Sequence, residues 1–129
     1  PLGLIVPRHH PLADTRSIAF SDTLHHDYVG LNANSALATY LEEQALHVGA
    51  RLQIRIRADG FDGVMRMVAR GAGLAIVPLA AVERWPGEAP FNCIALQEPW
   101  ARRTLQLCAR DFATLPGYAK ALLHALTLP

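Results

Sequence analysis

The chain has 129 residues, of which 51% are hydrophobic and 7% aromatic, and its formal net charge is +1 with the histidines neutral. This length is enough to bury a hydrophobic core but is short for two independent domains of ordinary size. The sequence has no overall basic excess that would hold a nucleic-acid backbone by neutralising its phosphates alone. We therefore expect one globular α/β unit that does not bind DNA through charge alone.

Strand-like apolar runs alternate with helical periodicities along the chain. In chain order the sequence predicts strands at residues 4–6 and 28–31, a helix at 36–48, a strand at 52–58, a helix at 61–69, a strand at 74–77, a short helix at 79–84, strands at 92–96 and 104–109, and a final helix at 116–128. Residues 8–27 are expected to be irregular. Strands that alternate with helices of this length are typical of an α/β sheet with helices on its faces.

The stretch at residues 52–58 alternates strictly between apolar and polar side chains. Leu52, Ile54, Ile56 and Ala58 share one side, and one glutamine and two arginines share the other. This alternation predicts a strand with one buried and one solvated face. The arginines are interpreted as part of the solvated face, with a subunit contact left as the alternative.

Several classes of function lack their usual patterns in this sequence. The sequence contains no run of about 18 apolar residues, so no membrane span is predicted. The start, PLGLIVPRHHPLAD, has no basic segment typical of a signal peptide. The chain also lacks an initiator methionine, so we interpret it as part of a longer protein. The two cysteines, Cys93 and Cys108, are too few for a disulfide framework and are expected to be free thiols.

Catalytic and metal-binding patterns are missing as well. No serine lies in a Gly-x-Ser-x-Gly turn, and the cysteines fall in predicted strands instead of at a helix start, where a thiol pKa would be lowered. The His-His pairs lack the i, i+4 spacing that lets two imidazoles share one zinc ion on a helix. Gly71 and Gly73 end a predicted helix and so indicate a tight turn, not a phosphate loop. We predict no enzyme, no metal and no cofactor.

Asn32, Asn34 and Ser35 form the best candidate site, because they lie where a predicted strand passes into a predicted helix. In open α/β sheets, ligands bind beyond the carboxyl ends of the strands. Free N–H groups and the positive end of the helix dipole favour a carboxylate at such a place. The same residues are also typical of simple helix capping, and the sequence leaves both roles open.

Three segments, VPRHHPLAD, YVGLNANSAL and DGFDGVMRMVARGAGLAIVPLAAVE, follow one another in an order and spacing that resemble the effector domain of LysR-type transcriptional regulators. The third segment is the most specific, although Gly60 stands where the family commonly has serine and Gly63 where it has alanine. The resemblance covers nearly the whole chain. It implies a type 2 periplasmic-binding-protein-like α/β fold, in which two lobes joined by crossing strands hold a small ligand between them.

On this resemblance, residues 1–129 are a partial effector-binding domain without the DNA-binding domain. Residues 8–109 would form mainly the second lobe, whereas residues 1–7 and 110–129 would be hinge strands and first-lobe remnants, including the C-terminal helix of the first lobe. The edge of the strand at residues 4–6 is then expected to need an outside partner. The same is expected of an apolar stripe on the final helix, formed by Ala119, Leu122, Leu123 and Leu126.

The resemblance also implies the partners and the site. It implies a small effector, expected to carry a carboxylate, a homo-oligomer, cytoplasmic localisation, and contact with DNA only through the missing domain. The implied effector contacts are Asn32, Asn34, Ser35, Phe61 and Asp62, the last two on the opposite side of the same lobe, with Pro7 and His10 at the hinge side of the cleft. The alternatives are a lobe of a solute-binding transport protein and an enzyme on the same fold.

Overall fold

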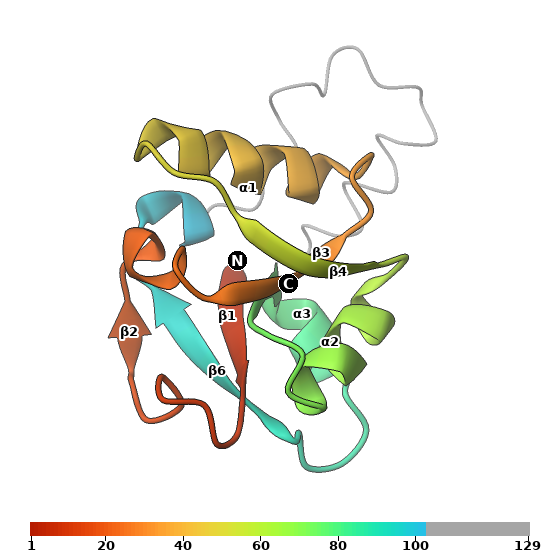
Figure 1. The fold of residues 1–129 in the computed structure, drawn as a ribbon. Helices are drawn as coiled ribbons and strands as arrows, with labels where there is room; N and C mark the ends of the chain where they lie inside the picture. Colours follow the sequence, from red (N-terminus) through yellow and green to blue (C-terminus); the bar gives the residue numbers. More distant parts are fainter. Residues whose placement is uncertain (103–129) are drawn as a thin grey trace.

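The computed structural model describes residues 1–102, which form a mixed β-sheet with helices on both faces (Figure 1). Four strands, β1 (Leu2–Pro7), β2 (Ser17–Ile18), β5 (Ala75–Pro78) and β6 (Phe91–Leu96), pair in the order β2-β6-β1-β5. Two more, β3 (Asp27–Leu31) and β4 (Gln53–Ala58), form a parallel pair. A parallel bridge between Tyr28 and Leu74 links β3 to the start of β5. Across this bridge the strand order is therefore β2-β6-β1-β5-β3-β4.

Strand β1 runs opposite to its two neighbours. It pairs antiparallel with β5 on one side and with β6 on the other, and Leu4, Ile5 and Val6 have no exposed surface. The expectation that this strand offers a free edge is therefore wrong, because β5 and β6 satisfy both of its edges. The other part of that expectation, the apolar stripe on the final helix, lies outside the described residues.

The two faces of the sheet carry separate hydrophobic clusters. Helix α1 (Ala36–His47) and the 3-10 turns η1 (Phe20–Thr23) and η2 (Pro99–Arg102) cover one face, and helices α2 (Phe61–Ala69) and α3 (Leu79–Glu83) cover the other (Figure 1). Leu4 belongs to the first cluster and its neighbour Ile5 to the second, as the alternation of side chains along a strand requires. The result is a three-layer α/β arrangement.

The predicted elements within residues 1–102 are confirmed, with small changes at their ends. The first strand is longer than expected, and the stretch at residues 8–27 contains β2 and η1 in addition to turns. Helix α2 ends before Gly71, whose φ is 86°, and the turn passes directly into β5. The strand predicted at 104–109 and the helix predicted at 116–128 lie outside the described residues.

The alternation predicted for β4 is wrong at Ile56, whose side chain is 41% exposed. Ile54 pairs with Tyr28 and Ile56 with Val29, so Arg55 is an extra residue on β4 at this point. An extra residue of this kind, a β-bulge, bends the strand and interrupts the regular alternation of side chains. Leu52, Ile54 and Ala58 are partly buried, as expected.

Candidate functional site

The starts of helices α1 and α2 lie at one edge of the sheet, because they follow neighbouring parallel strands (Figure 1). Leu31 and Ala58, the last residues of β3 and β4, are paired in register. The chain then continues from Leu31 to the turn before α1, and from Ala58 to the turn before α2. Five of the residues predicted for the site, Asn32, Asn34, Ser35, Phe61 and Asp62, are thereby brought to this carboxyl edge.

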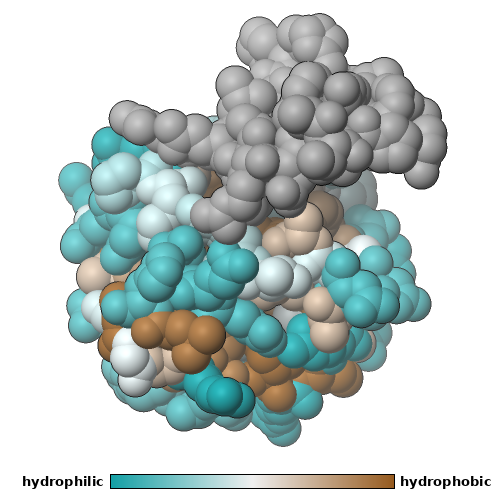
Figure 2. Space-filling model, turned by 90° about the horizontal axis from the view of Figure 1, so that it is seen from above, coloured by the Kyte–Doolittle hydropathy of each residue, from teal (hydrophilic) through white to brown (hydrophobic). Residues whose placement is uncertain are grey.

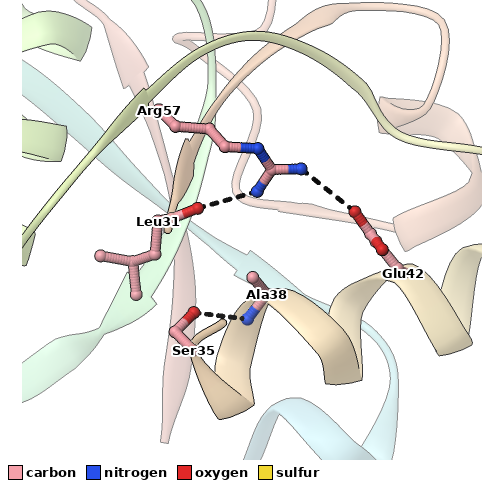
Figure 3. Close-up of polar contacts among 5 residues, drawn as sticks. All are labelled: Leu31, Ser35, Ala38, Glu42 and Arg57. Atoms are coloured by element: carbon pink, nitrogen blue, oxygen red, sulfur yellow. Dashed lines mark hydrogen bonds and ion pairs between the residues drawn. The ribbon is translucent and has the colours of Figure 1, made fainter. Parts of the chain in front are cut away.

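Ser35 is the N-cap of α1. Its Oγ accepts a hydrogen bond from the backbone N–H of Ala38 at 3.1 Å (Figure 3). Its own N–H donates to the carbonyl of Asn32 at 2.9 Å. The capping role, which the sequence left open, is therefore present. Because Oγ acts here as an acceptor, its hydrogen remains available for a further partner. Asn32 and Asn34 are exposed, and their side chains make no hydrogen bond within residues 1–102.

Helix α2 begins without a side-chain cap. Its N-cap is Gly60, which has an extended backbone and no side chain to accept from the first turn. The first N–H groups of an α-helix have no partner within the helix, so they are open to solvent or to a ligand. Phe61 is partly buried and packs against both hydrophobic clusters, whereas Asp62 is exposed in the first turn. The edge therefore combines uncapped N–H groups with an aromatic side chain and a carboxylate.

Arg57 connects the two strands to helix α1 (Figure 3). Its Nη1 donates to the carbonyl of Leu31 at 2.8 Å, and its Nη2 lies 3.2 Å from Oε1 of Glu42. Leu31 is the last residue of β3 and Glu42 lies on α1, so the guanidinium reaches across the turn that carries Asn32, Asn34 and Ser35. The sequence did not predict these contacts of Arg57, because its position in the alternation of β4 indicated a solvated side chain, with a subunit contact as the alternative.

Pro7 and His10 lie at the opposite end of the sheet. Pro7 ends β1, where it pairs with Phe91, and β1 runs antiparallel to β5. The ring of His10 lies 5.0 Å from that of His26, which comes just before β3 begins. The structure therefore separates these two residues from the five at the carboxyl edge.

The ionisable groups near His10 form a small cluster at this opposite end. The ring of His26 lies 4.4 Å from that of His25, and His10 Nδ1 accepts from the N–H of Leu12 at 3.1 Å. Burial, together with the neighbouring histidine, lowers the pKa of both His10 and His26, and Asp27 partly opposes this for His26. Within residues 1–102 no group of three or more metal-ligating side chains has a geometry suited to a metal ion.

Two hollows of the described part lie beside α1. A small cavity of about 20 Å³ lies between α1 and the strands β3 and β4, and an open hollow of about 330 Å³ lies between Glu42, Arg51 and Arg57. The asparagines, Ser35, Phe61 and Asp62 line neither of them.

The exposed surface on the α1 side is mostly hydrophilic, with apolar residues between the charged ones (Figure 2). Leu46, Val48 and Ile56 are the large hydrophobic side chains with the greatest exposure among the described residues. No helix of the described part is long and apolar enough to cross a membrane. Cys93 carries a free thiol whose pKa is raised by partial burial, and Cys108 lies outside the described residues.

A family model described as the LysR substrate binding domain matches residues 1–127. The chain therefore belongs to the LysR family, as part of its substrate-binding domain. The family is regulatory and is not a class of enzymes.

Two curated relatives are regulators of transcription. A probable RuBisCO transcriptional regulator from Phaeodactylum tricornutum is 26% identical over 112 residues, which are 84% of this chain and 36% of the relative. A hydrogen peroxide-inducible genes activator from Pectobacterium carotovorum is 25% identical over 117 residues, covering 91% of this chain and 39% of the relative. The chain thus spans little more than a third of the length of these relatives.

Solved structures of LysR-family domains share the fold. The effector-binding domain of QuiR in complex with shikimate has a TM-score of 0.66 at 20% identity, covering 76% of this chain and 46% of that domain. The regulatory domain of Synechocystis PCC6803 CcmR in complex with 2-PG gives 0.68 at 13% identity, covering 85% and 62%. The BenM effector-binding domain with benzoate gives 0.62 at 17% identity, covering 90% and 63%. The expected periplasmic-binding-protein-like fold is confirmed.

Proposed function

We propose that this chain senses a small organic anion for a transcriptional regulator, and that the anion binds at the carboxyl edge of β3 and β4. The observation that carries the proposal is the pairing of Leu31 with Ala58, which brings the starts of α1 and α2 together. Ligands in open α/β sheets bind beyond the carboxyl ends of parallel strands. The two helix starts supply N–H groups, and Asn32 and Asn34 supply amides that are unused within residues 1–102.

A carboxylate suits this edge better than a cation or a neutral ligand. Backbone N–H groups and the positive ends of two helix dipoles favour negative charge. The QuiR and BenM domains were solved with shikimate and benzoate, which are both small carboxylates. Phe61 supplies apolar surface for the body of such a ligand. Asp62 would repel a second negative charge placed near the start of α2, which favours a ligand with one carboxylate.

The whole protein would act by coupling ligand binding to the arrangement of two lobes. We propose that residues 8–109 belong mainly to the second lobe, with the missing part of the first lobe completing the cleft. A ligand shifts such an equilibrium only through its different affinities for the two arrangements. On this proposal the protein works in the cytoplasm without catalysis, and it contacts DNA through a domain that is not in this chain.

A homo-oligomer is part of the same proposal, on a different observation from the one we expected. Strand β4 has β3 as its partner on one side, and no described strand pairs with its other side. Exposed strand edges next to apolar side chains favour association, and Ile56 lies on this strand while Leu46 and Val48 lie near the end of α1. We therefore propose that a second copy of the chain packs against β4.

Pro7 and His10 are left out of the proposed site, because they lie at the opposite end of the sheet. These two residues could contact an effector only if it bound at that end of the sheet, away from the starts of α1 and α2. The membership of the chain in the LysR family favours the regulator over the solute-binding transport lobe, which shares the fold but not the family.

The test is calorimetric titration of the complete effector-binding domain with small carboxylates, including benzoate and shikimate. Asn32→Ala should weaken binding by about 1–3 kcal/mol if it leaves a buried ligand group unpaired. Ser35→Gly should also weaken binding, although glycine preserves most of the capping stability that alanine loses. His10→Ala is the matched control and should bind as the wild type does. Unchanged affinity in Asn32→Ala and Ser35→Gly would remove the carboxyl edge as the site.

A further inference from the structure

We propose that Arg57 is a positioning residue for the effector site, because its guanidinium ties the last carbonyl of β3 to the middle of α1. This inference rests on the proposed function, since the turn it spans carries the ligand contacts. Arg57 itself would not touch the ligand. It would hold the turn at residues 32–35 in one place relative to the start of α2.

The geometry of the contacts supports a bracing role (Figure 3). The backbone of Arg57 is fixed by its pairing with Gly30 on β3. From there Nη1 reaches the carbonyl of Leu31, just before the turn, and Nη2 reaches Glu42, about two helical turns after it. One side chain therefore contacts the chain on both sides of the turn.

The residue opposite leaves room for this side chain. A Cβ on Gly30 would lie 3.5 Å from Arg57 Nη1 and 3.3 Å from two carbons of Ile54. A larger side chain at this position would therefore crowd the path of the guanidinium. Arginine is suited to the position because its planar group donates in two directions at once, whereas a lysine ammonium is a single point charge on a flexible stem.

The packing of α1 explains why a brace matters here. Its buried side chains are Leu37, Ala38, Leu41 and Ala45, and a cavity of about 20 Å³ remains between them and the strands. The hydrogen bond from Ala38 to Ser35 lies within the helix start and does not join it to the sheet. The two contacts of Arg57 do join them. Because the side chain of Arg57 is 33% exposed, we expect a local effect and little change in global stability.

Amide hydrogen exchange of the full chain, followed by NMR without ligand, tests the brace directly. The reporters are the N–H groups of Ser35, Ala38 and Thr39, which bond within the turn and the first helical turn. In Arg57→Met their exchange should be about three to ten times faster than in the wild type. Amides in the middle of the sheet, such as Leu4 and Ile94, should not change.

Two further variants separate positioning from a general loss of stability. Arg57→Lys keeps the charge beside Glu42 and should restore part of the protection. Arg55→Met is the matched control, because Arg55 is exposed on the same strand and makes no hydrogen bond within residues 1–102. Equal acceleration at all amides in Arg57→Met, or the same acceleration in Arg55→Met, would overturn the proposal.

Titration of the complete domain with benzoate and shikimate adds the link to binding. Arg57→Met should raise the Kd of whichever carboxylate binds by about the same factor as it accelerates amide exchange. Arg55→Met should leave this Kd unchanged. Unchanged affinity in Arg57→Met, despite faster exchange in the turn, would also overturn the positioning role. Failure of the wild type to bind either carboxylate would count against the proposed function, while the exchange measurement would still decide whether Arg57 holds the turn.

Discussion

Leu31 and Ala58 end two neighbouring parallel strands in register, and this pairing brings the turns before α1 and α2 to the same edge of the sheet. Each strand leads through a short turn into a helix, so the starts of α1 and α2 face the same edge of the sheet. The strands also bring Arg57 within reach of the Leu31 carbonyl. The candidate site and the Arg57 contacts that span its turn thus both depend on the pairing of β3 with β4.

The first prediction concerns the cap of α1. Ser35→Ala removes the oxygen that accepts from the N–H of Ala38, so the free energy of unfolding should fall by about 1 kcal/mol. Thr39→Ala is the control, because Thr39 is exposed on the same helix beyond the cap. Urea unfolding followed by circular dichroism measures both. An equal effect of the two substitutions would show that the cap contributes nothing specific.

The second prediction concerns the buried hydroxyl pair formed by Thr23 of η1 and Tyr28 of β3. Thr23 Oγ1 lies 2.6 Å from both the carbonyl of Phe20 and the hydroxyl of Tyr28. Because the single hydrogen of Thr23 is donated to Phe20, Tyr28 must donate to Thr23. Burial raises the pKa of Tyr28 above its usual range, which keeps this donor protonated.

Removing either hydroxyl should therefore destabilise the fold, but not equally. Thr23→Val leaves the Tyr28 hydroxyl and the Phe20 carbonyl without this partner and should cost about 1–3 kcal/mol. Tyr28→Phe leaves only one acceptor position on Thr23 unfilled and should cost less. Chemical denaturation of both variants compares them. A larger loss in Tyr28→Phe than in Thr23→Val would contradict the assigned direction of the hydrogen bond.

The third prediction concerns the turn between α2 and β5. Gly73 has a φ of 157°, and a Cβ added there would lie 2.6 Å from the carbonyl oxygen of Asp27. Because that oxygen belongs to the backbone at the start of β3, it cannot move aside easily. Gly73→Ala should lower the free energy of unfolding by roughly 2 kcal/mol or more.

Gly87→Ala provides the comparison for this turn, because Gly87 has a φ of 75° but no atom within 4 Å of an added Cβ. It should cost only about 1 kcal/mol, from backbone strain alone. Thermal unfolding of the two variants separates the cost of the clash with the Asp27 carbonyl from the cost of a positive φ. Similar losses in both would show that the contact with Asp27 is relieved by small shifts.

The fourth prediction concerns pH. The pKa of His10 and that of His26 lie below the ordinary value of 6.5, so the unfolded chain binds more protons than the folded one as the pH falls below that value. The free energy of unfolding should therefore decrease as the pH is lowered through the histidine range. The stability that the two neutral histidines contribute should be fully present above about pH 6.5.

Denaturation at about pH 7.5 and about pH 5.5 measures this dependence. His26→Asn should reduce it, because the substitution removes one shifted group and the neighbour that disfavours protonation of His10. Thr39→Ala, an exposed substitution in helix α1 that removes no ionisable group, should leave the dependence unchanged. Equal slopes in wild type and His26→Asn would rule the cluster out as the cause.

The sequence predicted the elements of the fold well, because their signals are local. Ser35 and Gly49 mark the ends of α1, and the two glycines after α2 mark its turn into β5. The pairing of β1 between β5 and β6 was not predictable in this way, since it joins residues about 70 to 90 positions apart. The bulge that exposes Ile56 likewise depends on the register with β3.

The candidate site was predictable where it depends on one strand and the helix that follows it. Asn32, Ser35 and Phe61 come directly after predicted strands, so their place at the carboxyl edge follows from the α/β order. Pro7 and His10 were placed by resemblance alone, and the antiparallel direction of β1 carries them to the other end. Arg57 was missed because its partners are a carbonyl and a side chain on other elements.

The most direct test of the account is an amide NMR titration of the complete effector-binding domain with a carboxylate that it binds, chosen from a panel that includes benzoate and shikimate. We expect saturable shifts centred on the N–H groups of residues 32–38 and 60–64, at the starts of α1 and α2. The N–H groups near Pro7 and His10 should stay unchanged. Shifts confined to that opposite end of the sheet, or no saturable shift for any carboxylate at millimolar concentration, would contradict it.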